Sequence, residues 1–196
     1  MTHAVQPDLA ALEFETARLR ARRLCADDEP LFCSLYTDPD TMRFIGEPLS
    51  IACAARRFRE VLALMRVDPP EQWFCALVDH KSNLELGLCG VARIDRMRGR
   101  AELGVILQKS ARRRGLGREA WAGLVEATLG SLSIREVWAQ YAPGHEAFDR
   151  IAAGLGFELA CSPGSFDSAK GKQIRRMDRE MWNLRQFVRN QGKIHV

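Results

Sequence analysis

The sequence predicts one mixed α/β domain, of the α+β kind, rather than a regular βαβ repeat. With 196 residues the chain is long enough for one sizeable core, and its 46% apolar and 28% charged residues are typical of globular proteins. Its apolar patterns follow in the order strand, two helices, an antiparallel meander, and then strand–helix–strand–helix–strand. We therefore expect a single domain over residues 1–196, with residues 1–13 and 186–196 as peripheral tails.

The first elements are a strand and two helices. Apolar and basic residues roughly alternate over residues 16–24, as on a half-buried strand. A short helix is then expected to end near Tyr36, before a turn at residues 37–40 (TDPD). A second helix is expected over Ile51–Met65, with Ser50 as its cap, because apolar residues recur there at helical spacing.

A meander follows these helices. Its three strands are expected over residues 73–78, 86–95 and 101–107. Arg98–Gly99 is placed as a tight two-residue turn between the last two of them. Counting back from that turn pairs Asp95 with Glu102, so that two carboxylates face one another. A register slip of one residue would separate them.

The last part of the chain alternates helices and strands. A helix after residue 115 buries one face, made of Ala120, Trp121, Leu124, Val125 and Thr128. The remaining elements are a strand over 137–141, a helix over 146–153 that ends at Gly154, a strand from 156, a polar loop over 161–172 and a closing strand over 174–184.

Cysteine usage and the amino-terminal residues indicate the compartment. The six cysteines form no C-x-x-C pair and have no histidine at metal-ligand spacing, so we expect reduced, structural thiols and no metal. The opening MTHAVQPDLAALEFE lacks the basic-then-apolar order of a secretory signal, and no apolar run reaches the roughly 20 residues of a membrane span. A cytoplasmic protein without a membrane segment is expected.

The stretch QKSARRRGLGREAW (108–121) joins a strand to a helix and combines three arginines with two glycines. Gly115 and Gly117 let the backbone turn tightly and point several N–H groups at one anion, to which the helix dipole adds positive charge. Arg112, Arg113 and Arg114 would screen such an anion. A phosphate cradle, a nucleic-acid patch and an ordinary solvated turn all remain open on charge alone.

Known phosphate motifs do not account for this loop. The string G-x-x-x-x-G-K-[ST] of a Walker loop is absent. GLGREA matches the looser dinucleotide form G-x-G-x-x-A, but seven residues separate Leu107 from Gly115, and the acid about 20 residues onward, Glu136, precedes its strand. No regular aromatic stacking platform accompanies the arginines, so nucleic-acid binding is the least favoured class.

Several landmarks in order resemble the GNAT superfamily of acyl-CoA-dependent N-acyltransferases. The segment RRRGLG (112–117) meets that family's pyrophosphate pattern [QR]-x-x-G-x-[GA]. The opening ETARLRARRLCADDEPLFCSLYTDPDTMRFIG, the strand AELGVIL and the GLGF of residues 154–157 resemble its Rim-type branch, the ribosomal-protein amino-terminal acetyltransferases. The resemblance spans about residues 14–184.

This resemblance implies a fold and a cosubstrate. The implied sheet is mixed but mostly antiparallel and twisted, with about six to seven strands and about four flanking helices, and it splays between the strands at 101–107 and 137–141. The pantetheine arm of acetyl-CoA would enter that gap. The residues implied to bind acetyl-CoA are Val105, Ile106, Leu107, Arg112, Arg113, Arg114, Gly115, Leu116, Gly117, Arg118, His145 and Phe148.

Glu102 is the candidate general base, because the family commonly has a glutamate at this strand position and an attacking amine must lose a proton. An opposing Asp95 would raise one of the two pKa values, which suits a proton acceptor. The alternative is that Glu102 only pairs with a nearby arginine.

The chain departs from the Rim-type pattern N-x-A-S after the fifth strand. It has His145-Glu146-Ala147-Phe148 there, and Ala152 where other branches have a tyrosine, so both hydroxyls that protonate the CoA thiolate in relatives are absent. Tyr141 or His145 can supply the proton, or water can. Alternatively Tyr141 lines the cleft and His145 replaces the hydrogen bonds of the asparagine, while Phe148 packs on the cofactor arm.

The leading hypothesis is therefore transfer of an acetyl group from acetyl-CoA to a primary amine, either a protein amino terminus or a small amine. No metal is required. The missing hydroxyls also motivate an alternative, a non-catalytic acyl-CoA-binding or regulatory homologue. The resemblance further implies a homodimer, for which the residues themselves give no evidence.

Overall fold

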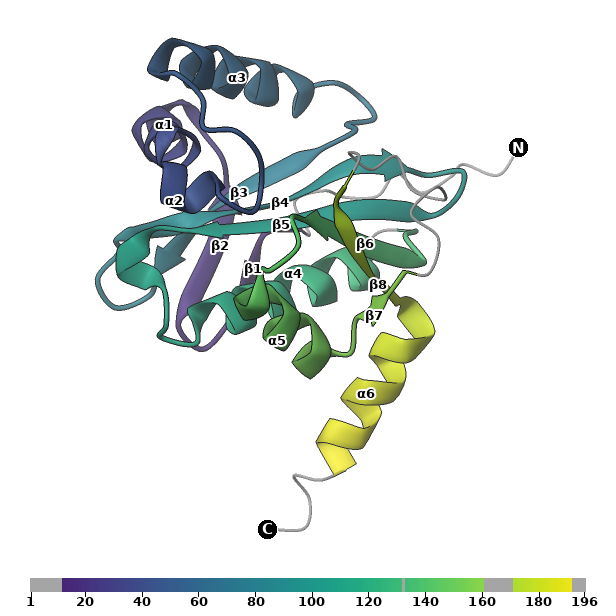
Figure 1. The fold of residues 1–196 in the computed structure, drawn as a ribbon. Coiled ribbons are helices and arrows are strands. Elements are labelled where there is room, and N and C mark those ends of the chain that lie inside the picture. Colours follow the sequence, from purple (N-terminus) through teal and green to yellow (C-terminus); the bar gives the residue numbers. More distant parts are fainter. Residues whose placement is uncertain (1–11, 132, 161–170, 192–196) are drawn as a thin grey trace.

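One eight-stranded sheet organises the residues that the computed structural model describes, which are 12–131, 133–160 and 171–191 (Figure 1). The strands are β1 (Phe14–Glu15), β2 (Leu19–Arg23), β3 (Trp73–Asp79), β4 (Glu85–Asp95), β5 (Arg100–Leu107), β6 (Glu136–Tyr141), β7 (Glu158–Leu159) and β8 (Gln173–Asp178). The helices are α1 (Glu29–Thr37), α2 (Pro39–Met42), α3 (Ile51–Leu64), α4 (Leu116–Ser131), α5 (Glu146–Leu155) and α6 (Arg179–Gln191).

The strand order is β1-β2-β3-β4-β5-β6-β8-β7, and each neighbouring pair is antiparallel except β5–β6. The parallel pair is short, because only Arg100–Glu102 of β5 bond to Glu136–Trp138 of β6. The rest of β5 pairs with β4 alone. The splay expected between these two strands is therefore confirmed, and among the described residues it leaves one edge of β5 without a strand neighbour.

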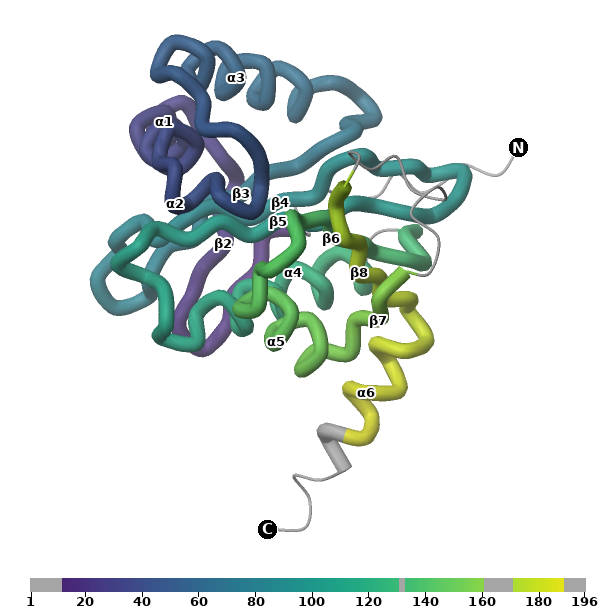
Figure 2. The backbone as a smooth tube through the Cα atoms, viewed as in Figure 1, coloured from purple at the N-terminus to yellow at the C-terminus, as the bar shows by residue number. Residues whose placement is uncertain are grey.

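The helices cover both faces of the sheet. Figures 1 and 2 show α1, α2 and α3 on one side and α4 and α5 on the other, with α6 projecting away from β8. Ser50 caps α3 as expected, since its Oγ accepts a hydrogen bond from Cys53 N at 3.2 Å. Phe32 of α1 packs against Phe58 of α3 with ring centroids 5.3 Å apart, which fixes the two helices against each other.

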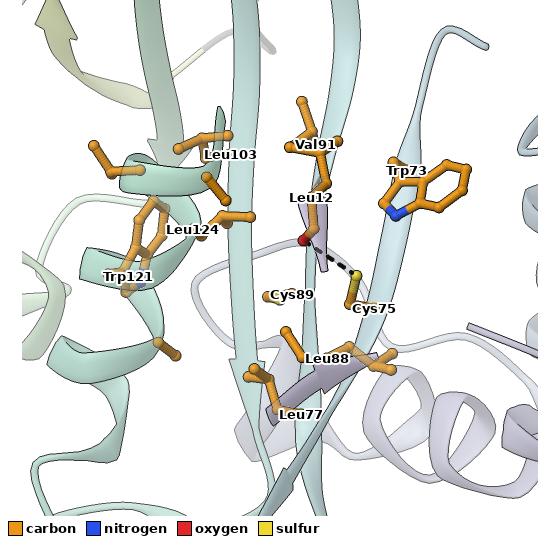
Figure 3. Packing of buried hydrophobic residues seen from close by; sticks show 14 of the residues in the cluster. Leu12, Trp73, Cys75, Leu77, Leu88, Cys89, Val91, Leu103, Trp121 and Leu124 are labelled. Carbon is orange, nitrogen blue, oxygen red and sulfur yellow. Dashed lines mark hydrogen bonds between the residues drawn. The ribbon is translucent and has the colours of Figure 1, made fainter. Parts of the chain in front are cut away.

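The second face has the apolar core that sequence periodicity predicted. Figure 3 shows Val91 and Leu103 of the sheet beside Trp121 and Leu124 of α4. Leu12 joins this core with 1% of its surface exposed, and its carbonyl accepts a bond from Cys75 Sγ at 3.7 Å. Residues 12 and 13 are thus not the peripheral tail that was expected.

The described cysteines are all free thiols, and Cys161 lies outside the described residues. Cys75 and Cys89 face each other across β3 and β4, both buried. The hydrogen bond that the Cys89 thiol donates to Cys75 is the main cause that raises the pKa of Cys89, and burial adds to it. These two residues act as small apolar side chains in the core.

The carboxyl-terminal prediction needs the largest correction. The expected strand over 174–184 stops at Asp178, and α6 follows, so residues 179–191 are helical rather than strand and tail. Asp178 starts this helix by accepting a bond from Met181 N at 2.8 Å. Trp182 is buried and donates its indole N–H to Glu126, which anchors α6 to α4.

Smaller corrections concern counts and ends. The described residues contain eight strands and six helices, against the expected six to seven and four; β1 and β7 have two residues each, and the turn expected at 37–40 is partly α2, capped by Asp38. Helix α5 passes Gly154 and ends at Leu155, and the next residue, Gly156, has a φ of +91° that suits a left-handed cap. Residues 161–170 of the expected polar loop lie outside the described residues.

Candidate active site

The loop between β5 and α4 exposes backbone N–H groups. After a short 3-10 turn at Lys109–Ala111, Arg113 and Gly115 both have left-handed backbone, with φ of +60° and +77°. Helix α4 begins directly afterwards at Leu116, and the first N–H groups of a helix have no carbonyl of their own helix to bond. The exposed loop and the helix dipole together form an anion-binding backbone.

The three arginines of this loop do not act alike. Arg113 and Arg114 are exposed, as is Arg118 in the first turn of α4. Arg112 instead turns inward, where its Nε donates to the Leu107 carbonyl at 3.0 Å and its Nη2 to Thr41 Oγ1 at 2.6 Å. Arg112 therefore ties the end of β5 to α2 rather than screening an anion from outside.

A cavity of about 340 Å³ lies beside the loop, between the β1–β2 segment and the start of α4. Arg18 and Glu119 form its polar wall through a salt bridge at 2.6 Å, and Arg18 Nη1 also donates to the Arg114 carbonyl at 2.9 Å. Burial opposes ionisation of Glu119, but hydrogen bonds from Thr16 and Arg18 outweigh it and lower the pKa of the carboxyl. This pair braces the loop from behind.

The open part of β5 leads into this loop. Val105, Ile106 and Leu107 pair with β4 on one side, and no strand in the described part of the chain pairs with them on the other. Continued past the Glu102–Trp138 pair, the β5–β6 register would place Tyr141 opposite Val105. One gap is therefore bordered by the strand expected to bind acetyl-CoA, by Tyr141 and by the glycine loop. The side chain of Leu116 is buried, so only its backbone faces the loop surface.

Glu102 does not face Asp95. The pairs are Ala92 with Glu102 and Asp95 with Arg100, so the expected carboxylate pair is wrong, and with it the argument for a raised pKa. The cause is a loop of residues 96–99 instead of a two-residue turn, closed by Asp95 Oδ1 accepting from Arg98 N at 2.9 Å.

The partners of Glu102 come from β4 and β6. Its Oε2 lies 3.2 Å from Arg93 Nη1, and its Oε1 accepts from Gln140 Nε2 at 3.0 Å. The Glu102 side chain is 17% exposed. The alternative that Glu102 pairs with an arginine is therefore what the structure has. Its neighbour Leu103 faces α4 (Figure 3), so Glu102 lies on the opposite face of the sheet, which carries α1 and α3.

Tyr141 is held in a buried network. Its hydroxyl donates to Asp149 Oδ1 at 2.6 Å and accepts from Arg175 Nε at 3.1 Å, while Arg175 Nη2 donates to the same Asp149 oxygen at 2.7 Å. Burial, together with the Asp149 carboxylate, raises the pKa of Tyr141. The phenol is therefore protonated at neutral pH, with a cation beside its oxygen that favours the phenolate once the proton leaves.

His145 caps α5. Its Nδ1 accepts from Phe148 N at 3.4 Å, and its ring stacks on Phe44 with centroids 4.3 Å apart. Burial lowers the pKa of the imidazole, so the neutral form with its proton on Nε2 dominates at pH 7. This matches the interpretation of His145 as a substitute for the asparagine's hydrogen bonds. Phe148 packs in the core, 4.8 Å from both Trp121 and Tyr141 by ring centroid.

The sequence did not predict a set of long-range contacts that link α2 and the segment after it to the ends of β5 and β6. The Phe44 carbonyl accepts from Ala142 N at 2.8 Å, which links the segment after α2 to the end of β6. Lys109 bridges Asp38 and Asp40 at 3.3 and 2.7 Å, which links α2 to the end of β5. These contacts join segments that are more than 60 residues apart in the sequence, so no local sequence pattern predicts them.

The described residues offer neither a metal-ligand cluster nor a helix that could cross a membrane. They contain no group of three or more His, Cys, Asp or Glu side chains arranged to hold a metal ion. Likewise, none of the helices in the described ranges has the length and apolar character to cross a membrane.

Comparisons with known proteins agree with this geometry. The model of the acetyltransferase (GNAT) domain matches residues 18–158. A Bacillus licheniformis protein described as uncharacterized N-acetyltransferase p20 is 24% identical over 160 residues, which cover 81% of this chain and 89% of that protein.

Solved structures share the fold at low identity. Spermidine N-acetyltransferase from Vibrio cholerae, solved with CoA and spermine, has a TM-score of 0.70 at 15% identity, covering 85% of this chain and 99% of that one. RimL, a ribosomal L7/L12 α-N-protein acetyltransferase solved with CoA, has a TM-score of 0.70 at 13% identity, covering 85% and 97%. The chain therefore belongs to the GNAT acetyltransferase family, and it is an acyl-CoA-dependent N-acetyltransferase.

Proposed function

We propose that this enzyme transfers the acetyl group of acetyl-CoA to a primary amine by direct attack, with both substrates bound at once. One observation carries the proposal. Strand β5 leaves β6 after Glu102 and ends at the glycine loop, so an open strand edge leads directly to an anion-binding backbone. Holding an amine and a thioester in one gap makes their reaction effectively intramolecular.

The loop would hold the pyrophosphate of CoA through the N–H groups of Gly115, Leu116 and Gly117. The fit rests on Gly115, which is exposed and has a φ of +77° that side chains rarely adopt. Arg113, Arg114 and Arg118 would surround the phosphates, while Arg112 supports the loop through Leu107. The pantetheine arm would run along the open edge of Val105, Ile106 and Leu107, with His145 and Phe148 bordering the gap.

Glu102 is the proposed general base. The amine nitrogen bonds to the acetyl carbonyl carbon, the C–S bond breaks, and the nitrogen loses a proton to Glu102 directly or through water. Backbone N–H groups of β5 would stabilise the oxyanion. The CoA sulfur leaves with the electron pair of the broken bond and is protonated afterwards.

Tyr141 is the proposed donor of that last proton. Its hydroxyl carries a proton at neutral pH, and Arg175 stands at 3.1 Å to stabilise the phenolate. His145 is the weaker candidate, because it is neutral and its Nδ1 is occupied by Phe148 N. A thiolate with a pKa near 8.5 leaves fairly well unaided, so this step contributes less than the base.

The acceptor class follows from the Rim-type resemblance and remains a proposal. We place the chain in that branch on its opening segment, its strand at 101–107 and the GLGF of 154–157. RimL shares the fold and acts on a protein, and the Vibrio cholerae enzyme shares it and acts on spermidine. A protein amino terminus and a small amine are thus both candidate acceptors.

Thermal unfolding with CoA, acetyl-CoA, NAD and ATP tests the cosubstrate. CoA at 100 times its dissociation constant stabilises a protein by about 2.7 kcal/mol, which raises the midpoint by roughly 5–10 °C at this size. We expect that shift with CoA and acetyl-CoA alone. A shift with NAD or ATP instead would contradict the proposal.

An amine panel with detection of the released CoA thiol tests catalysis. The absence of both hydroxyls, at Phe148 and Ala152, favours one second candidate, a non-catalytic acyl-CoA-binding homologue. CoA binding without thiol release across acidic, neutral and basic amines and peptide amino termini would support that candidate and reject acetyl transfer.

A further inference from the structure

A β-bulge interrupts the β4–β5 pair next to Glu102. Ala92 pairs with Glu102 and Asp95 with Arg100, so Arg93 and Ile94 together lie opposite Ala101. Arg93 has a φ of +48°, in the left-handed region that residues other than glycine seldom occupy. Bulges re-aim side chains and are frequent beside active sites, and such backbone outliers tend to mark functional positions.

The bulge turns Arg93 toward the reacting face. In a regular strand its side chain would alternate with that of Ala92 and point toward the α4 side. Instead Ile94 takes the core position, 9% exposed, and the Arg93 guanidinium lies 3.2 Å from Glu102 Oε2 and 5.8 Å from the ring of Trp138. The Arg93 side chain is 44% exposed, so it can be reached from solvent.

This placement constrains the acceptor. An amine that gives its proton to Glu102, directly or through one water, lies next to that carboxylate, and Arg93 contacts the same carboxylate. Groups a few bonds from the amine nitrogen therefore lie beside the guanidinium. A second cation there is repelled, as in a polyamine, whereas a carboxylate is bound by charge-assisted hydrogen bonds that an arginine can make in pairs.

The geometry points to Arg93 as the residue that selects acceptors, in favour of primary amines that carry a carboxylate a few bonds from the nitrogen. Arg93 binds that carboxylate and so orients the amine toward Glu102. The inference rests on the proposed function, since it takes Glu102 as the place where the amine reacts. It adds a substrate class that the glycine loop and the open strand edge do not specify.

Matched acceptors test this selectivity. Peptides that differ only in a first residue of Glu, Gln or Lys separate the charge effect at a protein amino terminus, and aspartate against asparagine amide does so for small molecules. Spermidine is the polycationic probe. We expect kcat/KM at least about tenfold higher for the acidic member of one series, and that series identifies whether the acceptor is a peptide or a free amino acid. Equal values in both series, or a preference for Lys and spermidine, would overturn the inference.

Variants separate selection from a merely structural role. Arg93→Ala should reduce the acidic preference to about twofold while the rate with the neutral acceptor falls less, and Arg93→Lys should retain part of the preference. Arg98→Ala is the matched control, an arginine of the same hairpin that pairs with Asp95, and it should keep the wild-type preference. An equal loss for all acceptors in Arg93→Ala would mean that Arg93 only supports Glu102, which contradicts the inference.

Calorimetry of acceptor binding to the CoA-loaded protein covers the case without turnover. Acidic amines should bind at least about fivefold more tightly than their amides in the wild type, and equally in Arg93→Ala. Absence of turnover with this Arg93-dependent binding would reject acetyl transfer and leave the selectivity standing. Turnover without any charge preference would support acetyl transfer and reject the selectivity. CoA-induced thermal shifts equal to wild type verify that each variant is folded.

Discussion

The proposed sites at the two ends of β5 use different chemical groups, backbone at one end and side chains at the other. At its carboxyl end, the proposed CoA site consists mainly of backbone: an open strand edge, two left-handed residues in the loop and the first turn of α4. At its amino end, the proposed acceptor site consists of side chains from three strands, with Glu102 between Arg93 and Gln140. Backbone recognises a group common to every turnover, whereas exchangeable side chains can adapt to one acceptor.

This contrast predicts that changes at the two ends have separable effects. The largest effect is expected at the acceptor end. Glu102→Gln should lower kcat by about 10²–10⁴-fold, because the amide cannot accept the amine's proton, while the dissociation constant of CoA changes less than about twofold. Steady-state kinetics and calorimetry with CoA measure the two quantities.

Glu60→Gln serves as the control for this change, since Glu60 lies on the outer surface of α3 and pairs with Arg56 and Arg57. It should behave as wild type. Unchanged turnover in Glu102→Gln would remove Glu102 from the mechanism. An equal loss of CoA affinity would contradict the claim that changes at the two ends of β5 have separable effects.

Between the ends, Tyr141→Phe is expected to have an intermediate effect. The substitution removes the hydroxyl but leaves Asp149 paired with Arg175 at 2.7 Å, so the fold around the gap persists. We expect kcat to fall by about tenfold or less, because a thiolate leaves fairly well without an acid. A poorly leaving thioester analogue should show a larger deficit in the same assay; an equal deficit would argue against proton donation by Tyr141.

At the CoA end the smallest effect is expected from Glu119→Gln, with a loss of about 1–2 kcal/mol in the free energy of unfolding. Burial opposes ionisation of Glu119, but bonds from Thr16 and Arg18 lower the pKa of its carboxyl. The Glu119 carboxylate therefore contributes its full stabilisation of the folded protein above the pKa of an unfolded glutamate, about 4.3. This contribution is lost as the pH falls through the lower pKa that Glu119 has in the folded protein.

Urea unfolding at several pH values between about 3 and 7 measures this contribution. The wild type should lose stability in the acid range more steeply than Glu119→Gln, with the two curves converging at low pH. Parallel curves would show that the carboxylate of Glu119 does not brace the loop. Turnover per CoA-bound molecule should be unchanged, because the residue lies behind the loop.

The fold around the proposed CoA site was predictable from sequence, and the partners of Glu102 were not. Glycine spacing, a helix with a buried face at Ala120, Trp121 and Leu124, and an apolar strand are all local patterns, and the structure has them where they were expected. The partners of Glu102 depend on a register that one bulge at Arg93 and one side-chain bond from Asp95 decide. Such irregularities have no reliable local signal.

The same reasoning explains the errors at the carboxyl terminus. The apolar positions after Asp178 are Met181, Trp182 and Leu184, which do not alternate as in a strand. The strand ends at Asp178, whose side chain caps α6. Burial of Trp182 against α4 then holds the helix in place. The expected strand was therefore extended past the point where alternation stops, and the cap at Asp178 and the contact of Trp182 with α4 fix the helix.

The central claim is that the glycine loop holds CoA, and Gly115→Val tests it most directly. Valine is strained at a φ of +77°, and its Cβ would lie 3.4 Å from Arg18 Nη2, so the backbone of the loop has to change its conformation. Gly171→Val is the matched control, with a φ of +82° and no atom of the described residues within 4 Å of its Cβ position. Calorimetric titration with CoA should show affinity at least about 100-fold weaker in Gly115→Val and near wild type in Gly171→Val. Folded Gly115→Val protein that binds CoA as tightly as wild type would contradict the account.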